Sequence, residues 1–239
     1  MKGLNSIFII LAVAFGLQAC LEKGTHTAVY YRQPGVVGYE GDFYLIRTRT
    51  GIYSDTLPEN EFSLGDYILA TYIINEDKVV GSYPTLTGLQ AEKVDHSRVR
   101  TGPVSESSYP DSIVNMKVFM TSLDTVLFFQ FDQRAPKQVI YDYELTYDPD
   151  SLSHDTCNFY IKAWKRNVPE EGTDTTRNIY YAVKMDEFVK ELSSGRNDEF
   201  ILRFNYMTGT NKYARYGTEP VVWSVRDGIL TNLSDLSKE

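Results

Sequence analysis

Cysteine and histidine are scarce in this chain, which has two cysteines and three histidines among its 239 residues. The two cysteines are Cys20, which directly follows the apolar N-terminal segment, and Cys157. Two cysteines are too few for a disulfide-stabilised scaffold, which is therefore excluded. His26, His96 and His154 are far apart, and no His-x-x-x-His, Cys-x-x-Cys or Gly-x-Ser-x-Gly pattern occurs. These absences predict a protein with no metal site, no cofactor and no catalytic residue.

Basic residues are also few, since 24 Lys and Arg stand against 32 Asp and Glu, which gives a net charge of −8. Nucleic acids and anionic lipid surfaces are bound by clusters of Lys and Arg, so we expect neither as a partner. The densest basic cluster, Lys162 to Arg166, lies in a predicted strand and indicates a solvated strand face.

No apolar run is long enough to cross a bilayer as a helix. The run Ile7 to Phe15 follows the basic Lys2 and precedes small residues, a pattern typical of an export signal, here over residues 1–19. The tetrapeptide Leu17-Gln18-Ala19-Cys20 resembles a bacterial lipobox. The resemblance implies that Cys20 becomes the N-terminus and carries diacylglycerol and palmitate.

Two or more acyl chains hold a protein stably on a membrane, so we expect a lipid-anchored protein of the cell envelope. The residue after Cys20 is Leu21 and not Asp, which favours transfer to the outer membrane. The alternative is ordinary cleavage after Ala19, which leaves an unmodified thiol at Cys20.

Aromatic residues are abundant, with 18 Tyr and 12 Phe, and they favour pleated, half-buried strands. The hydrophobic fraction of 42% is sufficient for a folded core. The sequence therefore predicts a mainly β fold of one large or two small domains.

The first half of the sequence is expected to form a tether over residues 20–35 and a small barrel over residues 36–95. Strands are expected over 42–50, 52–54, 67–74 and 86–94, with a hairpin turn at 75–78. The strand at 67–74 is apolar on both faces, as in a strand inside a barrel or sandwich. Polar residues over 96–110 predict an interdomain linker.

The second half predicts an immunoglobulin-like β-sandwich over residues 111–228, followed by a polar tail over 229–239. Alternating apolar residues predict about seven short strands, among them a strand after Asp124 that is apolar on both faces. The spacing of Met185, Phe188, Val189 and Leu192 predicts one short helix.

The order of these segments resembles the NigD-like lipoproteins. The shared features are the lipobox cysteine, a strand Asp42-Phe43-Tyr44-Leu45-Ile46-Arg47-Thr48, a strand from Gly65-Asp66-Tyr67, and a Tyr-rich strand before residue 148. The resemblance implies an N-terminal barrel with the oligonucleotide/oligosaccharide-binding (OB) fold and a C-terminal β-sandwich. It implies no specific activity.

OB folds bind ligands on an exposed strand face that carries aromatic residues. Tyr44, Tyr53, Tyr67 and Tyr72 are therefore candidates for stacking on a ligand. The alternative is that these rings belong to the core of the sheet.

The triplet Asp-Ser/Thr-apolar recurs in the chain and resembles an O-glycosylation acceptor of exported bacterial proteins. Together with Asp174-Thr175-Thr176, it gives the candidate acceptors Thr56, Ser112, Thr125, Ser151 and Thr175. The alternative is a loop that enters a strand, where Asp followed by Ser or Thr is common.

We therefore expect a non-enzymatic binding or scaffold lipoprotein whose partner is a glycan or an envelope protein. One alternative is an enzyme that processes envelope polymers through a pair of carboxylates. Another is a bacteriocin-associated or immunity-type protein, which follows from the family resemblance alone.

Overall fold

The computed structural model describes residues 29–41, 43–55, 61–102, 115–149, 156–167, 172–192, 199–209, 212–217, 220–224 and 229–232. The predicted signal, Cys20 and most of the predicted linker lie outside these residues. The described chain is mainly β with one short helix, which confirms the predicted fold class. No helix among the described residues is long and apolar enough to span a membrane.

The N-terminal strands form a closed five-stranded barrel. It contains β1 (Val29–Glu40), β2 (Phe43–Thr48), β3 (Gly51–Asp55), β4 (Tyr67–Val80) and β5 (Tyr83–Arg98). The strands pair in the order β3-β2-β1-β4-β5, and a parallel pair between Ser54 of β3 and Thr85 of β5 closes the ring. This closed five-stranded arrangement is that of an OB fold.

The barrel core explains why β1 begins at Val29, within the segment predicted as a tether. Pro34 and Gly35 are typical of a turn, yet both are buried in β1, next to an irregularity in its pairing with β4. A Cβ atom on Gly35 would lie 3.2 Å from Ile68 Cγ1 and 3.3 Å from Ile46 Cγ2. Glycine is present because two core side chains approach the backbone closely, and not because the chain turns.

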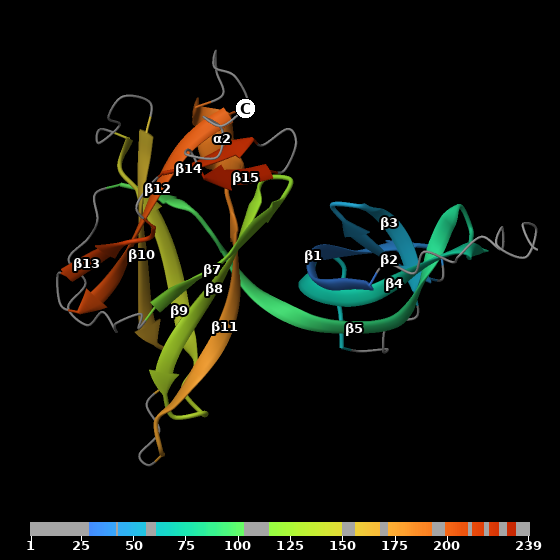
Figure 1. The fold of residues 1–239 in the computed structure, drawn as a ribbon, viewed down its shortest axis with the longest axis horizontal. Helices are drawn as coiled ribbons and strands as arrows, with labels where there is room; N and C mark the ends of the chain where they lie inside the picture. Colours follow the sequence, from blue (N-terminus) through green and yellow to red (C-terminus); the bar gives the residue numbers. More distant parts are fainter. Residues whose placement is uncertain are drawn as a thin grey trace, which may run out of the picture.

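One continuous strand joins the barrel to the sandwich. β5 pairs with β4 as far as Val94, and its last residues, Asp95–Arg98, pair with β11 (Thr175–Lys184) in the sandwich. Figure 1 shows β5 running from the barrel into the sandwich without a break. His96, Ser97 and Arg98 are therefore strand residues, although their polarity predicts a linker.

The sandwich consists of two sheets. In the first, β11 pairs with β8 (Val126–Ala135), and β8 pairs with β7 (Asn115–Leu123). The second has the order β15-β14-β12-β10-β9-β6, and β13 also pairs with β12. Its strands are β6 (Arg100–Thr101), β9 (Tyr141–Tyr147), β10 (Thr156–Lys165), β12 (Glu199–Gly209), β13 (Lys212–Arg215), β14 (Val221–Ser224) and β15 (Ile229–Asn232).

Helix α2 (Asp186–Leu192) packs against the core of the sandwich, as its apolar spacing predicts. Phe188 is fully buried, with its ring 4.9 Å from that of Tyr147 and 5.0 Å from that of Phe159. The opposite face of the helix carries Glu187 and Lys190 and remains in water.

A separate apolar cluster fills the seam between barrel and sandwich. The barrel contributes Tyr67, Leu69 and Val94, and the sandwich contributes Leu123, Val126, Phe128 and Ala182. Polar contacts surround this cluster: Arg47 of β2 pairs with Asp124 in the β7–β8 turn, and the Arg32 guanidinium lies 4.6 Å from the centre of the Tyr180 ring. The two modules therefore share one packed interface in addition to β5.

Two sequence-based expectations are wrong. The turn expected at 75–78 lies at Gly81-Ser82, because residues 76–78 form an irregularity within a longer β4. Lys162 is 1% exposed and is not part of a solvated face, because it lies between neighbouring strands and faces Glu144. Burial lowers the pKa of the Lys162 ammonium, and Glu144 opposes that change.

Candidate functional site

Two of the four candidate tyrosines lie inside the barrel. Tyr72 is fully buried and Tyr53 is 5% exposed, and their ring centres are 5.7 Å apart. Each alternates along its strand with outward residues, so its ring points into the barrel. Neither ring presents a face to a ligand, which fits the core alternative.

The hydroxyl groups of these rings join a polar cluster near the β2–β3 turn. The Tyr53 hydroxyl donates to Thr50 Oγ1 at 3.1 Å, and the Tyr72 hydroxyl donates to Thr48 Oγ1 at 3.2 Å. Thr48 and Thr50 are themselves linked at 2.9 Å. These bonds satisfy buried hydroxyls within the barrel.

Tyr67 lies in the seam and is 9% exposed. Its ring contacts Phe128 edge-on at 5.9 Å, and the Lys184 ammonium lies 5.2 Å from its centre. Burial raises the pKa of its hydroxyl, and the charge of Asp186 raises it further. Tyr67 therefore joins the two modules.

Tyr44 is the candidate nearest to solvent. It is half-buried, and its ring makes an edge-to-face contact with Tyr39 at 5.6 Å and 72°. Tyr39 lies opposite Tyr44 in the β1–β2 pair and is 54% exposed. The structure thus adds an exposed aromatic residue that the sequence interpretation missed.

Tyr39 and Tyr44 lie at the tip of the β1–β2 hairpin, which contacts the tip of the β4–β5 hairpin through Phe43. The residues at the two tips, here called the hairpin-tip surface, are Tyr39, Glu40, Phe43 and Tyr44 of the β1–β2 hairpin and Val79, Val80 and Tyr83 of the β4–β5 hairpin. Tyr39 and Tyr44 lie on one face of the β1–β2 hairpin, and Glu40 and Phe43 lie on the other. Tyr83 and Glu40 form a side-chain hydrogen bond, which raises the pKa of the Tyr83 hydroxyl. A Cβ atom on Gly81 would lie 3.0 Å from the tip of the Phe43 ring, so the two hairpins are in contact.

Large exposed apolar side chains are concentrated on the barrel. Among the described residues, seven of the eight belong to β1–β4 and the loop before β4, and only Ile140 belongs to the sandwich. Three of the seven, Tyr39, Val79 and Val80, lie on the hairpin-tip surface. An exposed apolar patch on a protein surface commonly marks a contact site.

The turn between β1 and β2 carries a pattern from which this surface could have been predicted. Tyr39-Glu40-Gly41-Asp42-Phe43 places aromatic residues on both sides of a polar turn, and Gly41 has a φ of 62°. Side chains beside such a turn lie at the open end of a barrel, where exposure is greatest. The pairing of Tyr83 with Glu40 has no signal in the sequence, because 43 positions separate them.

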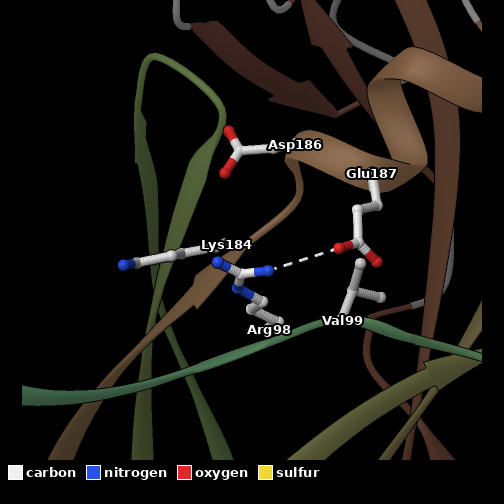
Figure 2. Close-up of a pocket in the computed structure, with 5 residues that line it drawn as sticks. All are labelled: Arg98, Val99, Lys184, Asp186 and Glu187. Carbon is white, nitrogen blue, oxygen red and sulfur yellow. Dashed lines mark hydrogen bonds and ion pairs between the residues drawn. The ribbon is translucent and has the colours of Figure 1, made fainter.

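A small hollow of about 170 Å³ lies where β5 and β11 meet α2. It is lined by Arg98, Val99, Lys184, Asp186 and Glu187. Figure 2 shows Arg98 reaching Glu187, with the paired atoms 3.4 Å apart, while Lys184 points away from Glu187. Asp186 accepts a hydrogen bond from the Thr125 hydroxyl, and Lys184 lies against Tyr67. Two basic and two acidic side chains line the hollow, so their charges balance, and each of them contacts a neighbouring side chain. This arrangement favours a structural role.

The predicted glycosylation residues are distributed between described and undescribed segments. Thr125 donates its hydroxyl hydrogen to Asp186, and Thr175 donates to the carbonyl oxygen of Ala135 at 3.4 Å. Thr56, Ser112 and Ser151 lie outside the described residues. Glycosylation of this set stays a prediction.

Within the described ranges, no three His, Cys, Asp or Glu side chains are grouped closely enough to hold a metal ion. Cys157 is buried at 3% exposure in the sandwich core.

Comparisons with known proteins establish the fold. No family model matches the chain, and no curated protein matches it. A protein of unknown function from Bacteroides vulgatus is 14% identical, with a TM-score of 0.58, over 88% of this chain and 99% of that one.

Two further solved structures share the architecture. A protein proposed to be a lipoprotein, from Bacteroides fragilis, is 12% identical with a TM-score of 0.53, over 82% of this chain and 95% of that one. A NigD-like immunity protein from Bacteroides caccae is 10% identical with a TM-score of 0.52, over 87% and 98%. The resemblance to NigD-like proteins is thereby confirmed at the level of the fold.

Proposed function

We propose that this chain is a non-enzymatic lipoprotein of the bacterial cell envelope, held on the outer membrane by lipid on Cys20. In this proposal the barrel binds a glycan or an envelope protein through the hairpin-tip surface. The observation that carries the proposal is the concentration of exposed apolar side chains on the barrel, with Tyr39 at the tip of the β1–β2 hairpin and Val79 and Val80 at the tip of the β4–β5 hairpin. The lipobox-like sequence before Cys20 supports the anchor, as does the fold shared with a protein proposed to be a lipoprotein.

The anchor is tested by growing cells that express the full chain with radiolabelled palmitate. We expect the protein to carry the label and to fractionate with the outer membrane. Cys20→Ala should abolish labelling and membrane association, whereas Cys157→Ala should keep both, because Cys157 is buried. An unlabelled wild-type protein would contradict the anchor.

The contact role is tested by presenting the purified protein with glycans and with solubilised envelope proteins. We expect at least one partner to bind wild-type protein and to be lost with Tyr39→Ala. Tyr31→Ala is the matched control, because Tyr31 is a 69% exposed tyrosine of the same strand outside the hairpin-tip surface. Binding that is the same in both variants would contradict the assignment of this surface.

An immunity-type role is the second candidate, favoured by the fold shared with a NigD-like immunity protein. It requires one tightly bound protein toxin as the partner. Co-purification of a single secreted protein that is toxic to cells lacking this chain would favour this role over a general contact role.

A further inference from the structure

We propose that the start of β1 lies against the membrane surface that carries the lipid on Cys20. This inference rests on the proposed anchor and names the part of the barrel that faces the bilayer. Three observations support it: the place of β1 in the chain, two exposed apolar side chains at its start, and the absence of charge around them.

The start of β1 cannot lie far from a lipid on Cys20. Eight residues separate Cys20 from Val29, the first residue of β1. A chain spans at most about 3.6 Å per residue, so Val29 lies within roughly 32 Å of Cys20 whatever path the chain takes. This short connection keeps the start of β1 at a high effective concentration near the bilayer, where a weak contact is sufficient.

Two apolar side chains at this end of β1 are exposed, while the residue between them is packed. Tyr30 packs on the barrel core, with its ring stacked 5.2 Å from that of Tyr72. The flanking Val29 and Tyr31 are 42% and 69% exposed. Because side chains alternate along a strand, the inward Tyr30 places both of them on the outer side of the barrel.

The side chains beside Val29 and Tyr31 on the outer face of the barrel carry no charge. The strand register gives these neighbours on β4 and β5 as Thr71, Ile73, Thr87 and Gln90. The next residue of β1, Arg32, has its guanidinium 3.6 Å from the Glu92 carboxylate, so these two charges offset each other. Anionic lipid headgroups repel an acidic protein surface, and this part of the barrel avoids that repulsion in a chain with a net charge of −8.

The backbone at Tyr31 is held in place by the fold itself. The pairing of β1 with β4 is irregular between Tyr30 and Gln33, and Arg32 has a φ of 45°. The Arg32 amide donates to Thr71 Oγ1 at 3.1 Å, and the Gln33 side chain donates to the Tyr31 carbonyl oxygen at 3.0 Å. A bulge of this kind changes the direction of nearby side chains, and here it leaves Tyr31 largely exposed. A backbone that is already fixed loses little entropy when a bilayer covers it.

A bilayer surface fits these side chains better than a protein partner does. Tyrosine is enriched at membrane–water interfaces, because its ring is apolar while its hydroxyl stays among the headgroups. Val29 and Tyr31 together expose on the order of 200 Å², against about 800 Å² that one partner buries in a standard protein interface. So small an area does not hold a protein partner by itself, whereas the lipid on Cys20 already keeps the chain on the membrane.

Environment-sensitive fluorescence of the acylated chain tests the proposal. The protein is purified from membranes and reconstituted into vesicles of phosphatidylethanolamine and phosphatidylglycerol. A nitrobenzoxadiazole label is attached to one introduced cysteine in a Cys157→Ala background, at Tyr31→Cys, Tyr39→Cys or Ile140→Cys. We expect blue-shifted emission, and quenching by a spin label on the lipid headgroup, for the label at Tyr31→Cys alone. Tyr39, at the other end of β1, and Ile140, in the sandwich, are matched controls, because they are 54% and 46% exposed.

The contribution of the Tyr31 ring is measured with the label at Val29→Cys. Tyr31→Asp should shift the equilibrium between contact and separation about tenfold toward separation, because a charge replaces an apolar ring, and headgroup quenching should fall accordingly. Tyr31→Trp should retain the quenching, since tryptophan also favours the interface. Tyr39→Asp adds the same charge at the other end of β1 and should leave the quenching unchanged. Thermal unfolding should confirm that every variant is folded.

Flotation of the vesicles distinguishes failure of this inference from failure of the anchor. A chain that floats with the vesicles while the label at position 31 stays in water, or while the label at position 39 is quenched as strongly, would overturn the assignment of this face and leave the anchor standing. Quenching at Val29→Cys that is the same with Tyr31→Asp would also overturn it. A chain that carries no lipid and does not float would overturn both.

Discussion

Asp66 is the residue with the clearest electrostatic role in the barrel. Its carboxylate accepts hydrogen bonds from the Ser63 amide at 2.7 Å and from the Lys93 ammonium at 2.7 Å, immediately before β4 begins. Burial raises the pKa of this carboxyl, but the bonds from Lys93 and Ser63 outweigh burial, so the pKa lies below its ordinary value of 3.8. The ionised form is therefore the one that stabilises the fold.

We predict that Asp66→Asn lowers the free energy of unfolding by about 1 kcal/mol at pH 7, because the bond to Lys93 loses its charge. A carboxyl with a lowered pKa stabilises the fold above its unfolded pKa and loses that effect as pH falls through the folded pKa. The difference between variant and wild type should therefore shrink below about pH 4. Urea unfolding at pH 7 and pH 3 measures this, and an equal difference at both values would contradict it.

Single residues also show where sequence interpretation succeeds and fails. Apolar alternation places Ile46, Ile68 and Phe204 in cores correctly, because alternation reports which face is buried. The same pattern cannot say whether a tyrosine at such a position has its ring in a core, as Tyr72 does, or half in solvent, as Tyr44 does. Whether such a ring is buried or half-exposed depends on how far the residue lies from the end of the barrel.

At the scale of the strand, two segments that are apolar on both faces meet at the seam. In β4, Ile68 and Tyr72 face the barrel core while Tyr67 and Leu69 face the sandwich. In β8, Phe129 faces the sandwich core while Phe128 faces the barrel. Double-faced apolarity predicts a strand covered on both sides, but the sequence does not reveal that the second cover is the other module.

The β7–β8 turn connects the sandwich to the barrel through a residue in an unfavourable conformation. Asp124 has a φ of 51° and pairs with Arg47 of β2. A side chain with a branched Cβ is strained in this region of φ, whereas glycine is not. The turn therefore combines a modest ion pair with a modest backbone cost.

We predict that Asp124→Gly changes the free energy of unfolding by less than about 0.5 kcal/mol, because relief of backbone strain offsets loss of a half-exposed ion pair. Asp124→Val should destabilise by about 2 kcal/mol more than Asp124→Gly. Thr176→Val, at an exposed position of β11, is the control for placing valine on the surface. Equal stability of the two Asp124 variants in denaturant titrations would contradict the turn argument.

For the whole molecule, the seam decides whether the barrel and the sandwich unfold together. Phe128 is 1% exposed and contacts Tyr67 across the seam, and β5 belongs to sheets of both modules. Both tryptophans, Trp164 and Trp223, lie in sandwich strands, so their fluorescence reports on that module alone. Far-UV circular dichroism reports on both modules.

We predict that the wild type unfolds in one transition with coincident signals from both probes. Phe128→Ala should lower stability by about 3–5 kcal/mol and separate the two signals, because the seam loses its central ring. Phe204→Ala removes a similar volume from the sandwich core alone and should lower stability while the signals stay coincident. Separate signals already in the wild type would contradict coupling.

The division into barrel, linker and sandwich stays a prediction, and β5 shows why its boundaries are hard to infer. Asp95-His96-Ser97-Arg98 is polar, and polar runs are common in linkers. These residues form a strand because β11 lies beside them and supplies backbone partners. Pairing with a distant segment leaves no local mark in the sequence.

The shared strand also constrains how such a chain can change over generations. A recombination event that exchanged one half for an unrelated module would remove part of a strand from the half that remains. Exchange of the barrel would leave unsatisfied backbone groups along Tyr181–Lys184 of β11 and would expose Phe128 to water, whereas exchange of the sandwich would expose Tyr67 and Leu69. Descent with both halves together, and diversification mainly at the loops and exposed hairpins, is the course that this single strand imposes.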